Sequence, residues 1–154
     1  MDEAFMLFLN DIPVDMQGFV VELDKELTDK GCKRTIKPAK SGYVTSYSSP
    51  ISGKALLNYV FRKTGVKMRI YAERIAEHTD VLDRLPAGMK NDIKKAGDCK
   101  KLLGQNCSPT CKAGYTFTMD GVEYKKCRNM AFFHSLNEEN CKYLEELIEL
   151  EISR

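Results

Sequence analysis

Two alternating runs joined by Asp120-Gly121 constrain this chain more than any other stretch. In YTFTM (115–119) and VEYKK (122–126), apolar and polar side chains alternate, as they do in half-buried strands. Asp-Gly accepts the positive φ values that a two-residue hairpin turn requires. The sequence therefore predicts an antiparallel hairpin here. The predicted facing pairs are Met119 with Val122, Phe117 with Tyr124, and Gly114 with Cys127.

The rest of the chain adds helices and more strands. Over Ala55–Glu73, apolar residues alternate on both sides of a Lys63-Thr64-Gly65 turn, which predicts a second hairpin. Further strands are expected at 35–37, 42–48 and 129–136. Apolar residues at helical spacing predict helices at about 2–10, 15–30, 87–101 and after Asn137 or Ser135. This order predicts a single α+β domain over 1–154, with helices packed on a mainly antiparallel sheet.

The composition narrows the class of protein. Hydrophobic residues make up 43% of the 154 residues, which is enough for a core without disulfides. The 24 Lys and Arg against 22 Asp and Glu argue against a general nucleic-acid-binding protein. The N-terminal apolar run begins with acidic residues and is ended by Pro13, so neither a signal peptide nor a membrane span is expected. We therefore expect a cytoplasmic protein, in which structural disulfides are rare.

Four of the six cysteines lie in the segment 99–127. Cys107 and Cys111 are separated by three residues, a spacing that is common in zinc sites. The predicted hairpin returns Cys127 toward these two residues, on the polar side of the hairpin. Four thiolates suit a tetrahedral structural zinc ion. The predicted zinc ligands are Cys99, Cys107, Cys111 and Cys127, with His134 as an alternative fourth ligand.

The same thiols have other interpretations. They could stay unliganded, form a disulfide, hold an iron–sulfur cluster or take part in redox chemistry. Basic side chains directly flank Cys127, and their charge lowers the pKa of a nearby thiol. A thiol-dependent enzyme or redox sensor that uses Cys111 or Cys127 is therefore the main alternative to a structural metal site.

Candidate ligand-binding residues lie in the long hairpin and in the strand before it. They are Tyr47, Arg62, Lys67, Arg69 and Tyr71. A basic strand face with an aromatic ring suits an anionic ligand or a single-stranded nucleic acid. The competing interpretation is the solvated outer face of a half-buried sheet, which the near-neutral total charge favours. We expect binding of a small molecule or a protein partner, and nucleic-acid binding through the hairpin is a weaker alternative.

The sequence leaves open whether the protein is an enzyme. It has no phosphate-binding glycine loop, no paired-carboxylate motif and no dinucleotide-binding fingerprint. No catalytic motif surrounds its two histidines, His78 and His134. For His134, an exposed or edge position is the favoured interpretation over a catalytic one.

The hairpin GKALLNYVFRKTGVKMRIYAE (53–73) and the C-terminal helix resemble the YdhG-like small bacterial domains. The resemblance implies a bacterial, cytosolic scaffold of the ligand-binding type. The cysteine segment 99–127 is not part of that family's pattern. The resemblance therefore assigns no functional residue.

Overall fold

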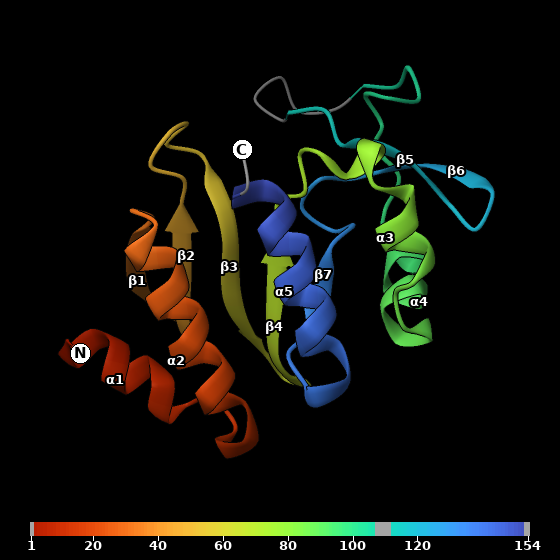
Figure 1. Cartoon of the computed structure of the whole chain (residues 1–154). Coiled ribbons are helices and arrows are strands. Elements are labelled where there is room, and N and C mark those ends of the chain that lie inside the picture. Colours follow the sequence, from red (N-terminus) through yellow and green to blue (C-terminus); the bar gives the residue numbers. More distant parts are fainter. Residues whose placement is uncertain (1, 107–111, 153–154) are drawn as a thin grey trace.

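The computed structural model describes residues 2–106 and 112–152, and it has the α+β architecture that the sequence predicts (Figure 1). Its helices are α1 (Glu3–Asn10), α2 (Val14–Asp29), the 3₁₀ turn η1 (Ile75–Glu77), α3 (Thr79–Asp83), α4 (Ala87–Lys95) and α5 (Glu138–Ile152). Its strands are β1 (Lys33–Ala39), β2 (Gly42–Ser48), β3 (Ala55–Arg62), β4 (Gly65–Ile70), β5 (Tyr115–Met119), β6 (Val122–Lys126) and β7 (Phe133–Ser135). Five strands form an antiparallel sheet in the order β1-β2-β3-β4-β7, and β5 and β6 form a separate antiparallel hairpin.

Side-chain caps fix the start of two helices. The Asp2 carboxylate accepts a hydrogen bond from the Phe5 N–H at 2.8 Å, and α1 begins there. The Asn137 side chain accepts one from the Asn140 N–H at 2.8 Å, so Asn137 rather than Ser135 caps α5. Each oxygen satisfies a backbone donor that has no partner within the helix. None of the described helices is both long and apolar enough to cross a bilayer.

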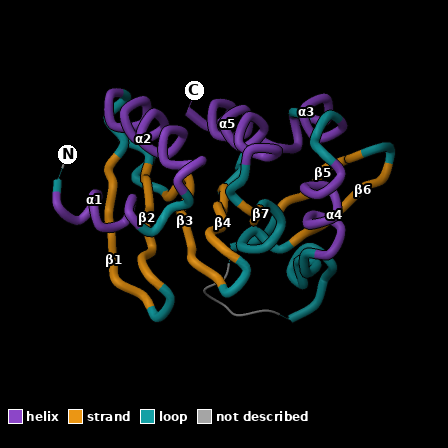
Figure 2. Tube along the Cα trace, turned by 90° about the horizontal axis from the view of Figure 1, so that it is seen from below, coloured by secondary structure: helices purple, strands orange, loops and turns teal. Residues whose placement is uncertain are grey.

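Helices cover one face of the five-stranded sheet. Figure 2 shows α2 and α5 on the same side of the sheet, and the fully buried Tyr47, Tyr59 and Met68 belong to the core beneath them. The Phe8 ring of α1 packs against Tyr59, with 5.3 Å between the ring centres. Aromatic and aliphatic side chains from three helices and the sheet thus form the buried core that anchors the strands.

The opposite face of the sheet, called here the open face, carries a different set of side chains. Side chains alternate between the two faces along a strand, so the residues between the core positions point away from α2 and α5. One row across the open face consists of Thr35, Ser46, Asn58, Arg69 and Phe133. The next row consists of Lys37, Val44, Val60, Lys67 and Ser135.

A smaller part of the molecule lies beside the β7 edge of the sheet and consists of η1, α3, α4 and the β5–β6 hairpin (Figure 1). The fully buried Phe132 joins the two parts, because its ring centre lies 5.8 Å from that of Tyr115 and 5.5 Å from that of Phe117. An ion pair of 3.0 Å between Lys90 of α4 and Asp120 also holds the tip of the hairpin.

The hairpin predicted around Asp120-Gly121 is confirmed. Both residues have positive φ, 51° for Asp120 and 79° for Gly121, as a two-residue turn requires. The pairing has the predicted register, Met119 with Val122 and Phe117 with Tyr124. The sequence did not indicate that this hairpin stands apart from the main sheet.

The helix predicted over 87–101 is too long, since α4 ends at Lys95. Ala96 is extended, and residues 97–99 run alongside the end of β6 through a bridge between Asp98 and Lys126. The buried Lys126 side chain stabilises this end, because its Nζ donates to the Lys94 and Ala96 carbonyl oxygens at 3.1 and 2.9 Å. These are carbonyls that the end of a helix leaves without a partner.

The strand predicted over 129–136 is also too long. The Met130 and Ala131 N–H groups both donate to the Cys127 carbonyl, so a turn occupies the first part of this stretch. Of the predicted stretch, β7 (Phe133–Ser135) is the part that forms a strand, and it pairs with β4. The consequence is that Asn129 and Met130 project beside the open face instead of extending the sheet.

Candidate functional site

A hollow of about 320 Å³ lies where the open face meets the end of α4. Its lining residues are Arg62, Lys67, Arg69, Asp92, Lys95, Ala96, Asn129, Met130 and Phe133. Strands β3, β4 and β7 supply one wall, and α4 with the 127–131 turn supplies the other. We call this feature the basic hollow, because four of its lining side chains are cationic and one is acidic.

Three cations gather around the Phe133 ring in the basic hollow. The Arg69 guanidinium carbon lies 4.6 Å from the ring centre, the Lys67 ammonium 5.3 Å and the Arg62 guanidinium carbon 5.4 Å. Each distance is within the range of a cation–π contact. The ring thus holds three like charges close together, which an anionic ligand would stabilise.

Arg69 is fixed in this arrangement by hydrogen bonds. Its Nε donates to the Asn129 carbonyl at 2.7 Å, and a terminal nitrogen donates to the Asn58 side-chain oxygen at 3.3 Å. Among the described residues, Arg62 and Lys67 make no ion pair. Arg69 is therefore held in place by neutral oxygens, and none of the three cations makes an ion pair with a described residue.

The structure brings together three of the five predicted ligand-binding residues. Arg62, Lys67 and Arg69 line the basic hollow, whereas Tyr71 lines a second hollow of about 270 Å³ that it shares with Glu73. Tyr47 lies in the core on the opposite face of the sheet, and its hydroxyl donates to Asp24 at 2.7 Å. Burial raises the pKa of Tyr47 well above its usual range. Tyr47 therefore serves the core and shares no surface with the hollow.

A charge pattern in the sequence points to this face and was not used in the prediction. Residues 30–72 contain ten Lys or Arg and no Asp or Glu. The other 111 residues contain 14 Lys or Arg and 22 Asp or Glu. The near-neutral total thus conceals a separation of charge, because residues 30–72 include all of β1 to β4.

His134 lies in the edge strand β7, but it is fully buried, which the favoured exposed position did not anticipate. Its Nδ1 lies 2.9 Å from the Asp92 carboxylate, and Nε2 has no partner among the described residues. Asp92 lines the basic hollow, whereas the buried imidazole does not. His134 thus fixes the one acidic side chain of the hollow from behind.

Cys99 occupies a site that stabilises a thiolate. Burial opposes ionisation, but backbone N–H groups of Gly114, Leu102 and Lys101 bond to the sulfur, and together they lower the pKa of Cys99. The Gly114 nitrogen lies 3.1 Å from Sγ. Only 6% of the Cys99 surface is exposed, so solvent has little access to this residue.

Cys127 lies next to the same segment. The Cys99 N–H donates to the Lys125 carbonyl at 2.9 Å, and the Cys127 N–H donates to the Gly97 carbonyl at 2.8 Å. Asp98 pairs with Lys126 in an antiparallel bridge. Cys99 and Cys127 are each one residue beyond this pair, so both lie on the same face of the two segments. Cys127 is half-buried just after β6, where the sequence predicted the polar side of the hairpin. The other two predicted zinc ligands, Cys107 and Cys111, lie outside the described residues.

Gly114 allows the chain to pass over the end of β6. A Cβ atom added to it would lie 2.0 Å from the Lys126 carbonyl oxygen and 3.0 Å from the Cys99 Cβ. Both distances are shorter than van der Waals contact, so no side chain fits here. The close approach brings the Gly114 N–H onto the Cys99 sulfur.

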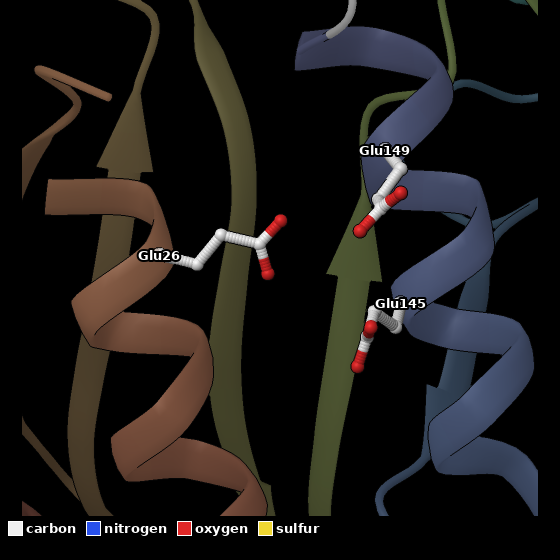
Figure 3. A group of neighbouring side chains, drawn as sticks. All are labelled: Glu26, Glu145 and Glu149. Carbon is white, nitrogen blue, oxygen red and sulfur yellow. The ribbon is translucent and has the colours of Figure 1, made fainter. Parts of the chain in front are cut away.

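The described residues contain one convergent group of three metal-ligating side chains, and it lies elsewhere. Glu26 of α2 points toward Glu145 and Glu149 of α5 (Figure 3), and one carboxylate oxygen from each lies within 4.8 Å of the others. Burial, a hydrogen bond with Glu26 and the charges of Glu26 and Glu145 raise the pKa of Glu149. His134 is not gathered with Cys99 and Cys127 in such a group.

Comparisons with protein-family models, with curated proteins and with solved structures found no match to this chain. The resemblance to YdhG-like domains stays a prediction. The two candidate sites are therefore interpreted from their own residues.

Proposed function

We propose that this protein is a binding domain for a ligand with an anionic group, and that the ligand binds in the basic hollow. The observation that carries the proposal is the gathering of Arg62, Lys67 and Arg69 around the Phe133 ring. Three cations that each lie within 5.4 Å of one ring centre repel one another, and a bound phosphate or carboxylate would relieve that repulsion. The guanidinium groups also match the geometry of such oxyanions.

The test is isothermal titration calorimetry with sodium tripolyphosphate at low salt. We expect binding to the wild-type protein and at least tenfold weaker binding to the double variant Arg62→Gln/Lys67→Gln. These two side chains are chosen because neither makes an ion pair with a described residue, so their removal leaves the fold intact. Thermal unfolding of the variant checks that expectation.

The matched control removes two charges from the helices. Lys25→Gln/Lys142→Gln lowers the net charge by the same amount, but it changes side chains of α2 and α5. We expect its affinity for tripolyphosphate to stay within twofold of wild type. Equal weakening by both double variants would show a general effect of net charge and would contradict a site in the hollow.

We further propose that the cysteine segment holds a structural zinc ion and that the protein works in a reducing, cytoplasmic compartment. The proposed ligands are Cys99, Cys107, Cys111 and Cys127. The thiolate-stabilising surroundings of Cys99 and the same parity of Cys127 support the proposal. A zinc ion would also supply the charge that compensates a buried thiolate.

Native mass spectrometry with metal analysis tests the zinc proposal. After purification in reducing buffer without chelators, we expect one zinc per chain, and we expect Cys99→Ser or Cys127→Ser to lose it. A metal-free protein with six titratable thiols would contradict the proposal. In that case, rapid alkylation of Cys111 or Cys127 alone would favour the thiol-dependent enzyme or redox sensor.

A further inference from the structure

We propose that the anionic ligand is a single-stranded nucleic acid, which binds in the basic hollow and continues across the open face toward β1. This inference rests on the proposed function, because it takes the hollow as the anion-binding site. It adds a polymer as the ligand class and a path for that polymer. The path runs from Phe133 past Ser46 to Thr35 and its basic neighbours.

Charge complementarity is the first support for a polymeric ligand. None of the residues in β1 to β4 is acidic, and the turns that join these strands add only basic charges. Of the strand cations, Arg34 alone makes an ion pair with described residues, and it does so with Asp2 and Asp24. The remaining cations are uncompensated, which is the electrostatic footprint of a polyanion-binding face.

The register of the sheet supplies the path. Arg69 and Thr35 occupy the same row, with Ser46 and Asn58 between them, and Lys67 and Lys37 occupy the next row. Strands are spaced about 4.8 Å apart, so Lys37 lies about 14 Å from Lys67 across the sheet. A single phosphate cannot contact both positions, whereas a chain of several nucleotides spans them.

An aromatic side chain favours a single strand over a duplex. Phe133 lies on the open face, among the three cations of the basic hollow. Unpaired bases stack on aromatic rings and on guanidinium planes, and this stacking adds to phosphate contacts. A duplex keeps its bases stacked on each other and offers the sheet only its phosphates.

The test is fluorescence anisotropy with 15-nucleotide oligo(U) and oligo(dT), a 15-base-pair duplex, and tripolyphosphate as a competitor. We expect the wild-type protein to bind both single strands, with affinity falling at least tenfold between 50 and 200 mM salt, and to bind the duplex at least tenfold more weakly. We expect Arg62→Gln/Lys67→Gln to weaken binding of the oligonucleotides and of tripolyphosphate.

A second double variant separates the polymer from the anion. Lys33→Gln/Lys37→Gln changes exposed side chains of β1, outside the hollow. We expect it to weaken oligonucleotide binding at least threefold and to leave tripolyphosphate binding within twofold of wild type. The helix variant Lys25→Gln/Lys142→Gln is the control for net charge in both assays.

Each outcome decides a different claim. Binding of tripolyphosphate without binding of either oligonucleotide would overturn the nucleic-acid inference and leave the anion-binding proposal standing. If neither tripolyphosphate nor an oligonucleotide binds, the anion-binding proposal and the nucleic-acid inference are both overturned. A duplex that binds as tightly as the single strands, or an unchanged oligonucleotide affinity of Lys33→Gln/Lys37→Gln, would overturn the inferred path across the open face.

Discussion

In the larger part of the molecule, α1, α2 and α5 bury large apolar side chains against a five-stranded sheet. In the smaller part, backbone contacts and polar side chains add to the apolar burial of the β5–β6 hairpin. Phe8 and Tyr59 represent the first kind of contact. The Lys126 side chain on the end of α4 and the Gly114 N–H on the Cys99 sulfur represent the second.

Under the proposed function, the two faces of the sheet have different roles, one in stability and the other in ligand binding. The helix-covered face of the sheet is mainly apolar and supplies the core, whereas the open face carries Lys37, Lys67 and Arg69. The smaller part then closes one side of the basic hollow with Lys95 and Asn129. Both of these residues are within a few positions of a proposed zinc ligand, Cys99 or Cys127.

We expect the largest loss of stability from a change at Phe132, which connects the two parts of the molecule. Phe132→Ala removes a fully buried ring that packs on Tyr115 and Phe117, and we expect it to lower the free energy of unfolding by about 3–5 kcal/mol. The neighbouring half-buried ring is the control, and Phe133→Ala should lose less than half as much. Chemical denaturation measures both. Equal losses would show that Phe132 does not connect the two parts.

We expect the second-largest loss of stability from a substitution at Gly114, where the chain passes close to the end of β6. Gly114→Ala places a methyl group against the Lys126 carbonyl, and we expect a loss of about 3 kcal/mol in the free energy of unfolding. Gly18 in α2 has no atom within 4 Å of an added Cβ, so Gly18→Ala should stabilise the protein by about 0.5–1 kcal/mol. A tolerated Gly114→Ala would mean that the chain does not pass over β6 as described.

The Lys126 side chain gives a smaller effect. Lys126→Met leaves the Lys94 and Ala96 carbonyls without their donor, and we expect a loss of about 1–3 kcal/mol in thermal unfolding experiments. Lys125→Met, one residue away, removes only a surface ion pair with Glu123 and should change stability by less than about 0.5 kcal/mol. Similar losses in the two variants would contradict a capping role for Lys126.

The smallest expected change in stability concerns the group of Glu26, Glu145 and Glu149 between α2 and α5. Glu145 helps to raise the pKa of Glu149, and a carboxyl group with a raised pKa in the folded state disfavours folding once it ionises. Glu145→Gln should therefore stabilise the protein by a few tenths of a kcal/mol at pH 7 and by nothing below about pH 4. Glu139→Gln, in the first turn of α5, should have the opposite sign. A stabilisation that persists at pH 3 would exclude repulsion as its cause.

The sequence predicts local structure best where the residue types of a turn or cap agree with the hydrophobic period of the segments beside it. Asp120-Gly121 between alternating runs specified both the turn and its register, and Asn137 matched its capping role. The end of α4 was missed because it depends on Lys126, which lies 30 positions away from Ala96 in the chain. A local sequence pattern cannot show that a lysine of the β5–β6 hairpin donates hydrogen bonds to the carbonyls at the end of a helix.

The candidate site was predictable only in part, for a similar reason. Alternation placed Lys67 and Arg69 on one side of the long hairpin. The position of Phe133 among them depends on β7 pairing with β4, which joins segments about 65 residues apart. The charge separation over residues 30–72 was visible in the sequence, but the total charge conceals it. The burial of His134 depends on contacts with α4 that periodicity does not reveal.

The central claim is that the basic hollow binds anions, and ¹H–¹⁵N NMR with added tripolyphosphate tests it most directly. We expect the largest shifts at the backbone amides of Arg62, Lys67, Arg69 and Phe133 and at the Arg69 Nε–H, with those of α2 and α5 unchanged. Shifts that cluster on the helix-covered side, or no shifts at millimolar tripolyphosphate and low salt, would contradict the claim.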